Sequence, residues 1–154
     1  MPSTVTRIGD YAFDGQITLK EISLNDNISY IGEHAFSGRL SCGPMQVFIH
    51  ELPEKLTTLG GSAFWMSGPN IHISKLPTGL TKLLRGSFSF TPNVRISSFG
   101  TETSDVGLQA IEESALYWTG NQDAYGKLDF TYVPEVKEIT FNKSVKQIGK
   151  NSFL

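Results

Sequence analysis

The chain has 154 residues with 13 basic and 15 acidic side chains, which gives a formal net charge of −2. Such a length suits one compact domain or a short repeat array, and the absence of a basic block argues against nucleic acid as a partner. The single cysteine, Cys42, excludes an internal disulfide framework and a cysteine-built zinc site, and no run approaches the roughly 18 apolar residues of a membrane helix, so no membrane insertion is expected.

The N-terminal segment MPSTVTRIGDYAF lacks the apolar core of a signal peptide. It leads directly into the phrase RIGDYAFDG at residues 7–15, which recurs as YIGEHAFSG at residues 30–38. A catalytic loop is normally made once, whereas a unit that must be stacked is made many times. The recurrence therefore favours a repeat architecture.

Six segments share the pattern of this phrase: an aliphatic residue followed four and five positions later by a small residue and a large apolar one. The large apolar residues are separated by 23, 28, 24, 28 and 37 positions, and periods of 20 to 50 residues are typical of solenoids. We call the aliphatic residue of each segment its anchor. The anchors, with their small and large partners, are Ile8/Ala12/Phe13, Ile31/Ala35/Phe36, Leu59/Ala63/Phe64, Leu83/Ser87/Phe88, Ile111/Ala115/Leu116 and Ile148/Ser152/Phe153.

A second phrase lies between the anchors. LKEISLNDNISYIG at residues 19–32 matches VKEITFNKSVKQIG at residues 136–149 at a constant offset of 117. The middle of the chain has a variant of this phrase, and its alternation of apolar and polar residues predicts short strands that a following proline ends. The variant segments are VFIHELP (47–53), IHISKLP (71–77), VRISSFG (94–100) and LDFTYVP (128–134).

The composition of the unit predicts how it packs. Glycine follows the anchor in four of the six segments and would allow a tight turn at positive φ. The small residue and the large apolar residue fit a short helical or 3₁₀ turn that places the large side chain beneath the strand. One unit cannot bury its own apolar face, so stacked copies would form parallel strands over a continuous core.

These phrases, Ile-Gly-x-x-Ala-Phe followed by Leu-x-x-Ile-x-Leu and Ile-x-x-Ile-Gly, resemble the BspA-type leucine-rich repeat over essentially the whole chain. The resemblance implies a leucine-rich-repeat solenoid, with short parallel β-strands in one sheet and turns or 3₁₀ segments on the opposite side. It also implies adhesion or protein binding at a cell surface, in a secreted protein or in a virion. We expect residues 1–154 to form a single domain of about six degenerate repeats, or a segment of a longer array.

The ends and the insertions are further candidates for contact. No polar cap is visible before Val5 and Ile8 or around residues 151–154, so self-association through open ends, or coverage by another polypeptide, is expected. Polar loops at residues 100–106 and 119–127 lengthen their repeats. These loops are either partner-binding insertions or tolerated surface variation.

Alignment of the predicted strands gives two outward columns. The first contains Phe48, His72, Arg95 and Asp129, and the second contains His50, Ser74, Ser97 and Thr131, with Tyr132 nearby. Aromatic and arginine side chains are enriched in recognition surfaces, so Phe48, His50, His72, Arg95, Asp129 and Tyr132 form a candidate ligand-binding face. The alternative is that they are ordinary solvated strand residues.

A second aromatic group follows the Ala-Phe segments: Trp65, Met66, Phe90, Tyr117 and Trp118. Its recurrence indicates packing between neighbouring repeats, or, where the side chains are exposed, a patch for assembly. His50 and His72 lie in different columns of the alignment and no ligand-spaced pair occurs within a repeat, so no metal or other cofactor is expected.

Motifs for nucleophilic, phosphate-binding and metalloprotease sites are absent, so we expect a protein without enzymatic activity. The leading interpretation is an interaction module that presents a face to a protein or cell-surface ligand. The alternative is a structural subunit of a larger assembly, such as a virion or surface-layer component.

Overall fold

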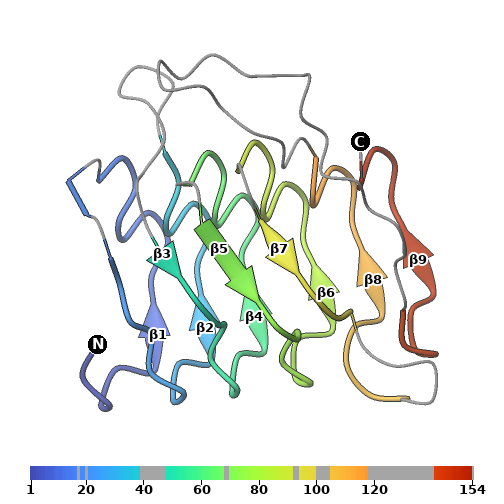
Figure 1. Ribbon diagram of the computed structural model, residues 1–154, viewed down its shortest axis with the longest axis horizontal. Helices are drawn as coiled ribbons and strands as arrows, with labels where there is room; N and C mark the ends of the chain where they lie inside the picture. The colour runs from blue at the N-terminus through green and yellow to red at the C-terminus, as the bar shows by residue number, and fades with distance from the viewer. Residues whose placement is uncertain are drawn as a thin grey trace.

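The computed structural model describes residues 1–16, 18–19, 21–38, 48–67, 70–91, 94–99, 105–117 and 141–153. Within these ranges the chain forms nine short strands and no helix. Accordingly, no described segment could cross a membrane as a helix. The strands lie side by side along the long axis of the molecule, with β1 near one end and β9 near the other (Figure 1).

The anchor residues themselves form strands. Each of these strands consists of an anchor and the residue before it, and all of them pair in parallel, for example Ile8 with Ile31 and Ile111 with Ile148. They form two sheets, ordered β1-β2-β4 and β6-β8-β9. The anchor strands are β1 (Arg7–Ile8), β2 (Tyr30–Ile31), β4 (Thr58–Leu59), β6 (Lys82–Leu83), β8 (Ala110–Ile111) and β9 (Gln147–Ile148).

The second phrase supplies a separate sheet. Its strands β3 (Phe48–Ile49), β5 (Asn70–Ile73) and β7 (Arg95–Ile96) pair in parallel in that order. The prediction of a single sheet is therefore wrong. The anchor segments, which were expected to form only turns, also contain strands that pair with one another. Residues 22–24 form no strand, and the segment 128–134 lies outside the described residues.

Turns link the two kinds of strand. Proline does not end β3 and β5 directly, since each strand ends several residues before Pro53 or Pro77. Instead, the carbonyl oxygens of Pro53 and Pro77 accept hydrogen bonds from the N–H groups of Leu56 and Leu80, at 3.0 Å in both cases. These turns bring Leu56 and Leu80 into the core just before the next anchor strand.

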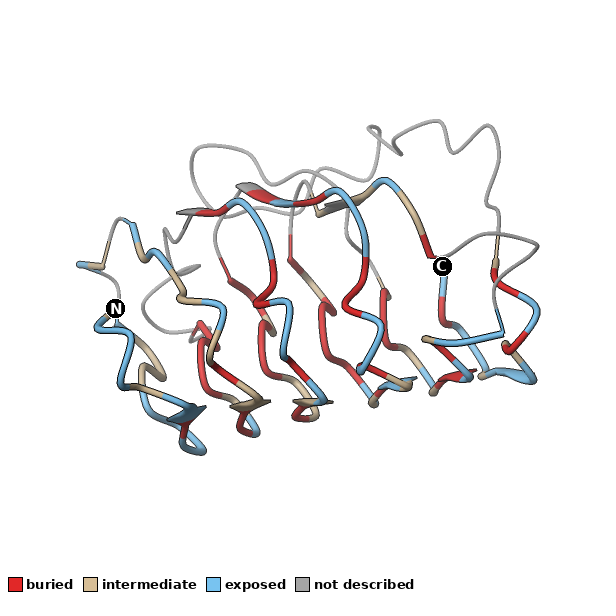
Figure 2. Ribbon diagram, turned by 90° about the horizontal axis from the view of Figure 1, so that it is seen from below, coloured by how far each residue is buried: buried red, intermediate tan, exposed pale blue. Residues whose placement is uncertain are grey.

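The core is a column of repeated apolar side chains. The rings of Phe13, Phe36, Phe64 and Phe88 stack in sequence with centroids 5.1 to 5.3 Å apart. Leu116 is buried at the equivalent position of the next unit. Buried residues accordingly recur at the same part of successive turns of the chain (Figure 2). The packing of the large apolar residue beneath the strands, predicted from the Ala-Phe segments, is confirmed for these units.

The positive φ of each turn falls two residues later than predicted. The residue three positions after every anchor is left-handed, whereas the glycine directly after the anchor is not. These residues are Tyr11 (φ 57°), His34 (51°), Ser62 (53°), Gly86 (69°), Ser114 (56°) and Asn151 (57°). The turn is therefore a property of the repeated backbone path, since it recurs with five different residue types. The described segments after the anchors are turns, without 3₁₀ helix.

The glycine after the anchor serves close approach instead. A Cβ on Gly32 would lie 2.5 Å from the backbone nitrogen of Asp10, and one on Gly149 would lie 2.5 Å from that of Glu113. A side chain at this position would push neighbouring units apart. After β6, the position that glycine takes in other units is occupied by Leu84. There the strands β4 and β6 lie side by side but do not form a hydrogen-bonded pair (Figure 1). Glu112 also occupies this position, but there the carboxylate accepts a hydrogen bond from the Arg85 N–H, and β6 and β8 stay paired.

Candidate functional site: a row of aromatic side chains

Five ring-bearing side chains from successive units form a continuous row on the surface. Tyr11 stacks on His34 with ring centroids 5.2 Å apart and 10° between the planes. His34 then meets Trp65 at 6.5 Å, Trp65 meets Phe90 at 6.2 Å, and Phe90 meets Tyr117 at 5.4 Å, all edge to face. We call these five residues the aromatic row.

The repeated turn places these side chains. Tyr11 and His34 occupy the left-handed position three residues after their anchors. Trp65 and Tyr117 each come directly after the large apolar residue of their units, and Phe90 comes two residues after Phe88. Hydrogen bonds between neighbouring turns fix their spacing, because the Phe90 N–H donates to the Tyr117 carbonyl at 2.8 Å and the Met66 N–H donates to the Ser89 carbonyl at 3.1 Å.

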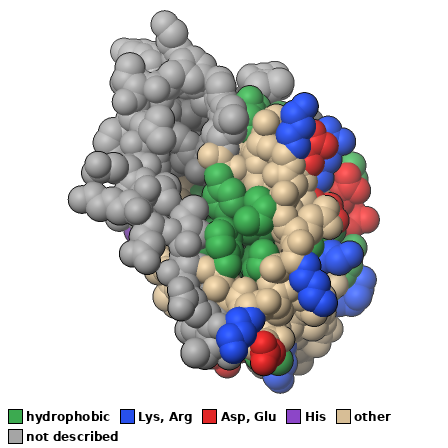
Figure 3. Space-filling model, turned by 90° about the vertical axis from the view of Figure 1, so that its right-hand side faces the viewer, with side chains coloured by type: hydrophobic (Ala, Val, Ile, Leu, Met, Phe, Trp, Pro, Cys, Tyr) green, Lys and Arg blue, Asp and Glu red, His purple; other side chains and the backbone are tan. Residues whose placement is uncertain are grey.

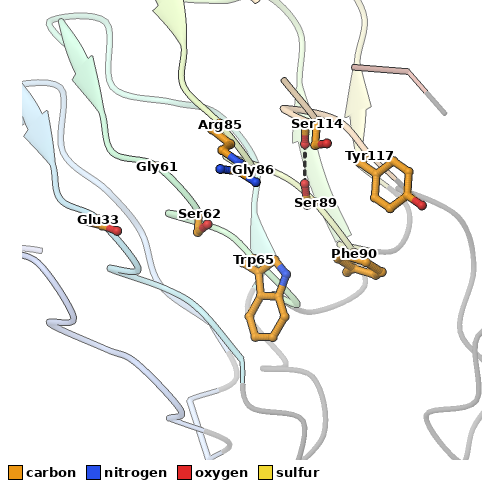
Figure 4. Close-up of a pocket in the computed structure, with 10 residues that line it drawn as sticks. All are labelled: Glu33, Gly61, Ser62, Trp65, Arg85, Gly86, Ser89, Phe90, Ser114 and Tyr117. Atoms are coloured by element: carbon orange, nitrogen blue, oxygen red, sulfur yellow. Dashed lines mark hydrogen bonds between the residues drawn. The ribbon is translucent and has the colours of Figure 1, made fainter. Parts of the chain in front are cut away.

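A shallow hollow of about 400 Å³ lies beside the row. The rings of Trp65, Phe90 and Tyr117 line one side of it (Figure 4). Small residues make up much of the rest: Gly61, Ser62, Gly86, Ser89 and Ser114. The Ser89 hydroxyl donates a hydrogen bond to the Ser114 carbonyl, which ties two neighbouring turns together beneath the hollow.

Charged side chains of both signs border the hollow. Glu33 and Arg85 are exposed and line it, while the three rings are half-buried. The surface thus combines apolar rings with one acidic and one basic group, which suits recognition of a mixed polar and apolar surface. Among the described residues, no cluster of three or more metal-ligating side chains accompanies it.

A family model for the BspA-type leucine-rich repeat region matches residues 1–117 and 121–154 in six copies. The chain belongs to the BspA-type leucine-rich repeat family. No curated protein and no solved structure matches it. The resemblance inferred from the Ile-Gly-x-x-Ala-Phe phrases is thereby confirmed.

The predicted assembly group only partly coincides with the aromatic row of this BspA-type chain. Trp65, Phe90 and Tyr117 lie together as expected. Met66 is only 8% exposed, so it belongs to the interior and does not contribute to an exposed patch. Trp118 lies outside the described residues. Tyr11 and His34 were not predicted to belong to this group, although each lies three residues after its anchor in the sequence.

The structure also corrects the predicted ligand-binding face. The column that placed Phe48 beside His72 was wrong by two residues at β3. Phe48 pairs with Asn70, and His72 pairs with Arg95. Extending the β3–β5 register by one residue places His50 level with His72, in the column assigned to Phe48. Both histidines are exposed. Asp129 and Tyr132 lie outside the described residues.

Proposed function

We propose that this chain is a non-enzymatic protein-binding or adhesion module and that the aromatic row is its binding surface. Its units would form a leucine-rich-repeat solenoid, which holds the row on a rigid frame. Leucine-rich repeats generally mediate protein binding. The single observation that carries the proposal is the continuity of the row: four successive ring contacts of 5.2 to 6.5 Å from Tyr11 to Tyr117.

The physical basis is the kind of side chain that the row presents. Trp65, Phe90 and Tyr117 are half-buried. Such rings supply a large contact area and lose little conformational freedom on binding, since they are already packed against neighbours. The charges of Glu33 and Arg85, which line the hollow, would orient a partner as it binds. The exposed side chains of His50 and His72, at the sheet β3-β5-β7, are a separate candidate site for a cell-surface ligand.

The experiment selects displayed random peptides on the immobilised chain and measures their affinity for variants. Trp65→Ala and Phe90→Ala should each weaken binding about 30-fold, as expected of an aromatic hot spot worth about 2 kcal/mol. Val106→Ala is the matched control, because Val106 is 66% exposed and lies outside the row. Peptides that bind all three variants as tightly as the parent chain would rule out the row as the binding surface.

A second candidate is a structural subunit of a larger assembly, such as a virion or surface-layer component. It is favoured by Ile148, which is 51% exposed although its counterparts at four other anchors are 0 to 4% exposed (Ile8, Ile31, Leu83 and Ile111). An apolar side chain on an open strand edge suits contact with another protein. Sedimentation across a concentration series tests it, since a monomer at every concentration would count against it.

A further inference from the structure

Two histidines on the sheet β3-β5-β7 have imidazole rings that are not engaged elsewhere. The side chains of His50 and His72 are exposed. Among the described residues, no hydrogen bond, ion pair or ring contact involves either imidazole. The third histidine of the chain, His34, differs because its ring is packed within the aromatic row. The nitrogens of His50 and His72 are therefore available to bind a ligand.

Two contacts, one on either side of His50, fix its position relative to β5. Before it, Ile49 pairs with Ile71 in parallel register. After it, the two oxygens of the Glu51 carboxylate lie 3.1 and 3.0 Å from the Ser74 nitrogen, whose N–H donates to them. The two chains thus stay side by side past His50, and the register that places the two histidines level with each other continues through this residue.

The level position brings the two imidazoles to the same face of the sheet. Ile49 and Ile71, which precede the two histidines, are buried, so the histidine side chains lie on the outward face. Neighbouring strands are about 4.7–4.9 Å apart. Imidazole nitrogens bind zinc at about 2.0–2.1 Å, so two rings at this spacing can hold one ion between them. The sequence argument against a metal assumed different columns for these histidines, and the register removes that assumption.

The surrounding groups favour an ion that prefers nitrogen ligands. Among the described residues, no group of three or more His, Cys, Asp or Glu side chains could hold a metal ion. The Glu51 carboxylate is already bonded to the backbone of the β5 segment. At the β9 end of the molecule, acidic side chains lie among lysine and arginine side chains, which does not suit Ca²⁺ or Mg²⁺ (Figure 3). Imidazole suits Zn²⁺, Cu²⁺ and Ni²⁺ instead.

We propose that His50 and His72 together bind one divalent transition-metal ion, such as Zn²⁺, through their imidazole nitrogens. Each histidine supplies one nitrogen, and water fills the remaining coordination positions of the ion. The site joins two neighbouring units of the chain, because one ligand lies beside β3 and the other in β5. The inference goes beyond the proposed protein binding, and it does not depend on the aromatic row.

The test is isothermal titration of Zn²⁺ into the parent chain and into His50→Gln and His72→Gln. All proteins carry Cys42→Ser, so that the only thiol does not bind the ion. Each substitution should weaken binding by about tenfold or more, since losing even a hydrogen-bond partner of a metal ligand costs about 10–100-fold. The double variant should bind little more weakly than either single variant, because one substitution already breaks the pair. His34→Gln is the matched control and should keep the parent affinity.

Electron paramagnetic resonance of bound Cu²⁺ gives a second measurement, because coupling to two imidazole nitrogens should fall to coupling to one in either single variant. Three results would overturn the proposal: a parent chain that binds no Zn²⁺, an affinity that His50→Gln or His72→Gln leaves unchanged, or an equal loss in His34→Gln. Without metal, both single variants should unfold at the parent temperature, since the replaced side chains are exposed. Trp65→Ala should keep the zinc affinity, so the failure of either proposal can be recognised separately.

Discussion

The ring of Phe64 stacks on that of Phe36, 28 residues earlier in the chain, with centroids 5.3 Å apart and 3° between the planes. Both side chains are fully buried. Near-parallel rings are expected when the same backbone turn is repeated by translation, because each phenylalanine then takes the orientation of the one before. This column of phenylalanine rings packs neighbouring units against one another, although the segments between the phenylalanines differ in length.

Phe64→Ala should lower the free energy of unfolding by about 3–5 kcal/mol, since it removes a ring packed on both faces and leaves a cavity. Urea denaturation followed by circular dichroism measures the loss. Phe13→Ala is the comparison, because Phe13 is half-buried and the described structure stacks only Phe36 on it. Equal losses in the two variants would contradict the role of two-sided stacking.

Gly60→Ala should destabilise the fold by about 1–3 kcal/mol, because the new methyl group would lie against the backbone of the preceding unit. Chemical denaturation of the purified variant measures this effect. Gly9→Ala makes the same substitution at the equivalent position with open space around it, and its stability should stay within about 0.5 kcal/mol of the parent. If both variants lost stability alike, conformational freedom and not close approach would explain these glycines.

Ser114→Gly should stabilise the chain by about 0.5–1 kcal/mol, because Ser114 has a φ of 56°, a conformation that costs a non-glycine residue about 1–2 kcal/mol. Thermal unfolding monitored by calorimetry would show the rise. The reverse change, Gly86→Ala at φ 69°, should destabilise, and its Cβ would also lie 2.9 Å from the Ser62 Oγ. An unchanged Ser114→Gly variant would show that the turn carries no such strain.

Tyr30 should ionise at higher pH than an ordinary tyrosine. Its hydroxyl donates a hydrogen bond to the Asp10 carboxylate at 3.1 Å, which raises its pKa by favouring the protonated phenol. The Arg7 guanidinium, 3.9 Å above the ring centroid, acts in the opposite direction but less strongly. Ultraviolet titration of tyrosinate should therefore lose a phase above the ordinary tyrosine range in Tyr30→Phe, and Asp10→Asn should move that phase to lower pH.

The hydrogen bond from Tyr30 to Asp10 also predicts how the stability of the fold changes with pH. The folded-state pKa of Tyr30 lies above its unfolded value, so the stabilisation is fully present below about pH 10 and is lost as the pH rises through the folded pKa. Tyr30→Phe should flatten this alkaline loss. An alkaline stability profile identical in the parent and Tyr30→Phe would contradict the hydrogen bond to Asp10.

Some features of the molecule could be read from the spacing of a few residues. Ile31, Ala35 and Phe36 recur as a set, and such a set is buried whenever its units stack, whatever path connects them. The alternation in IHIS likewise predicted a strand, and β5 covers Asn70–Ile73. Both predictions depend on local periodicity, which survives changes in the length of the loops.

The spacing of the repeated phrases was enough to predict BspA-type units and the burial of most of their anchors, because such a period is satisfied when units stack on one another. It did not predict that Ile148 would be half exposed. Which backbone groups meet became clear only from the folded chain. The tertiary structure placed the anchors in strands of their own, moved the left-handed residue two positions past the glycine, brought His50 level with His72 and joined Tyr11 and His34 to Trp65. These relationships depend on the register between units of unequal length, and hydrogen bonds between neighbouring turns set that register.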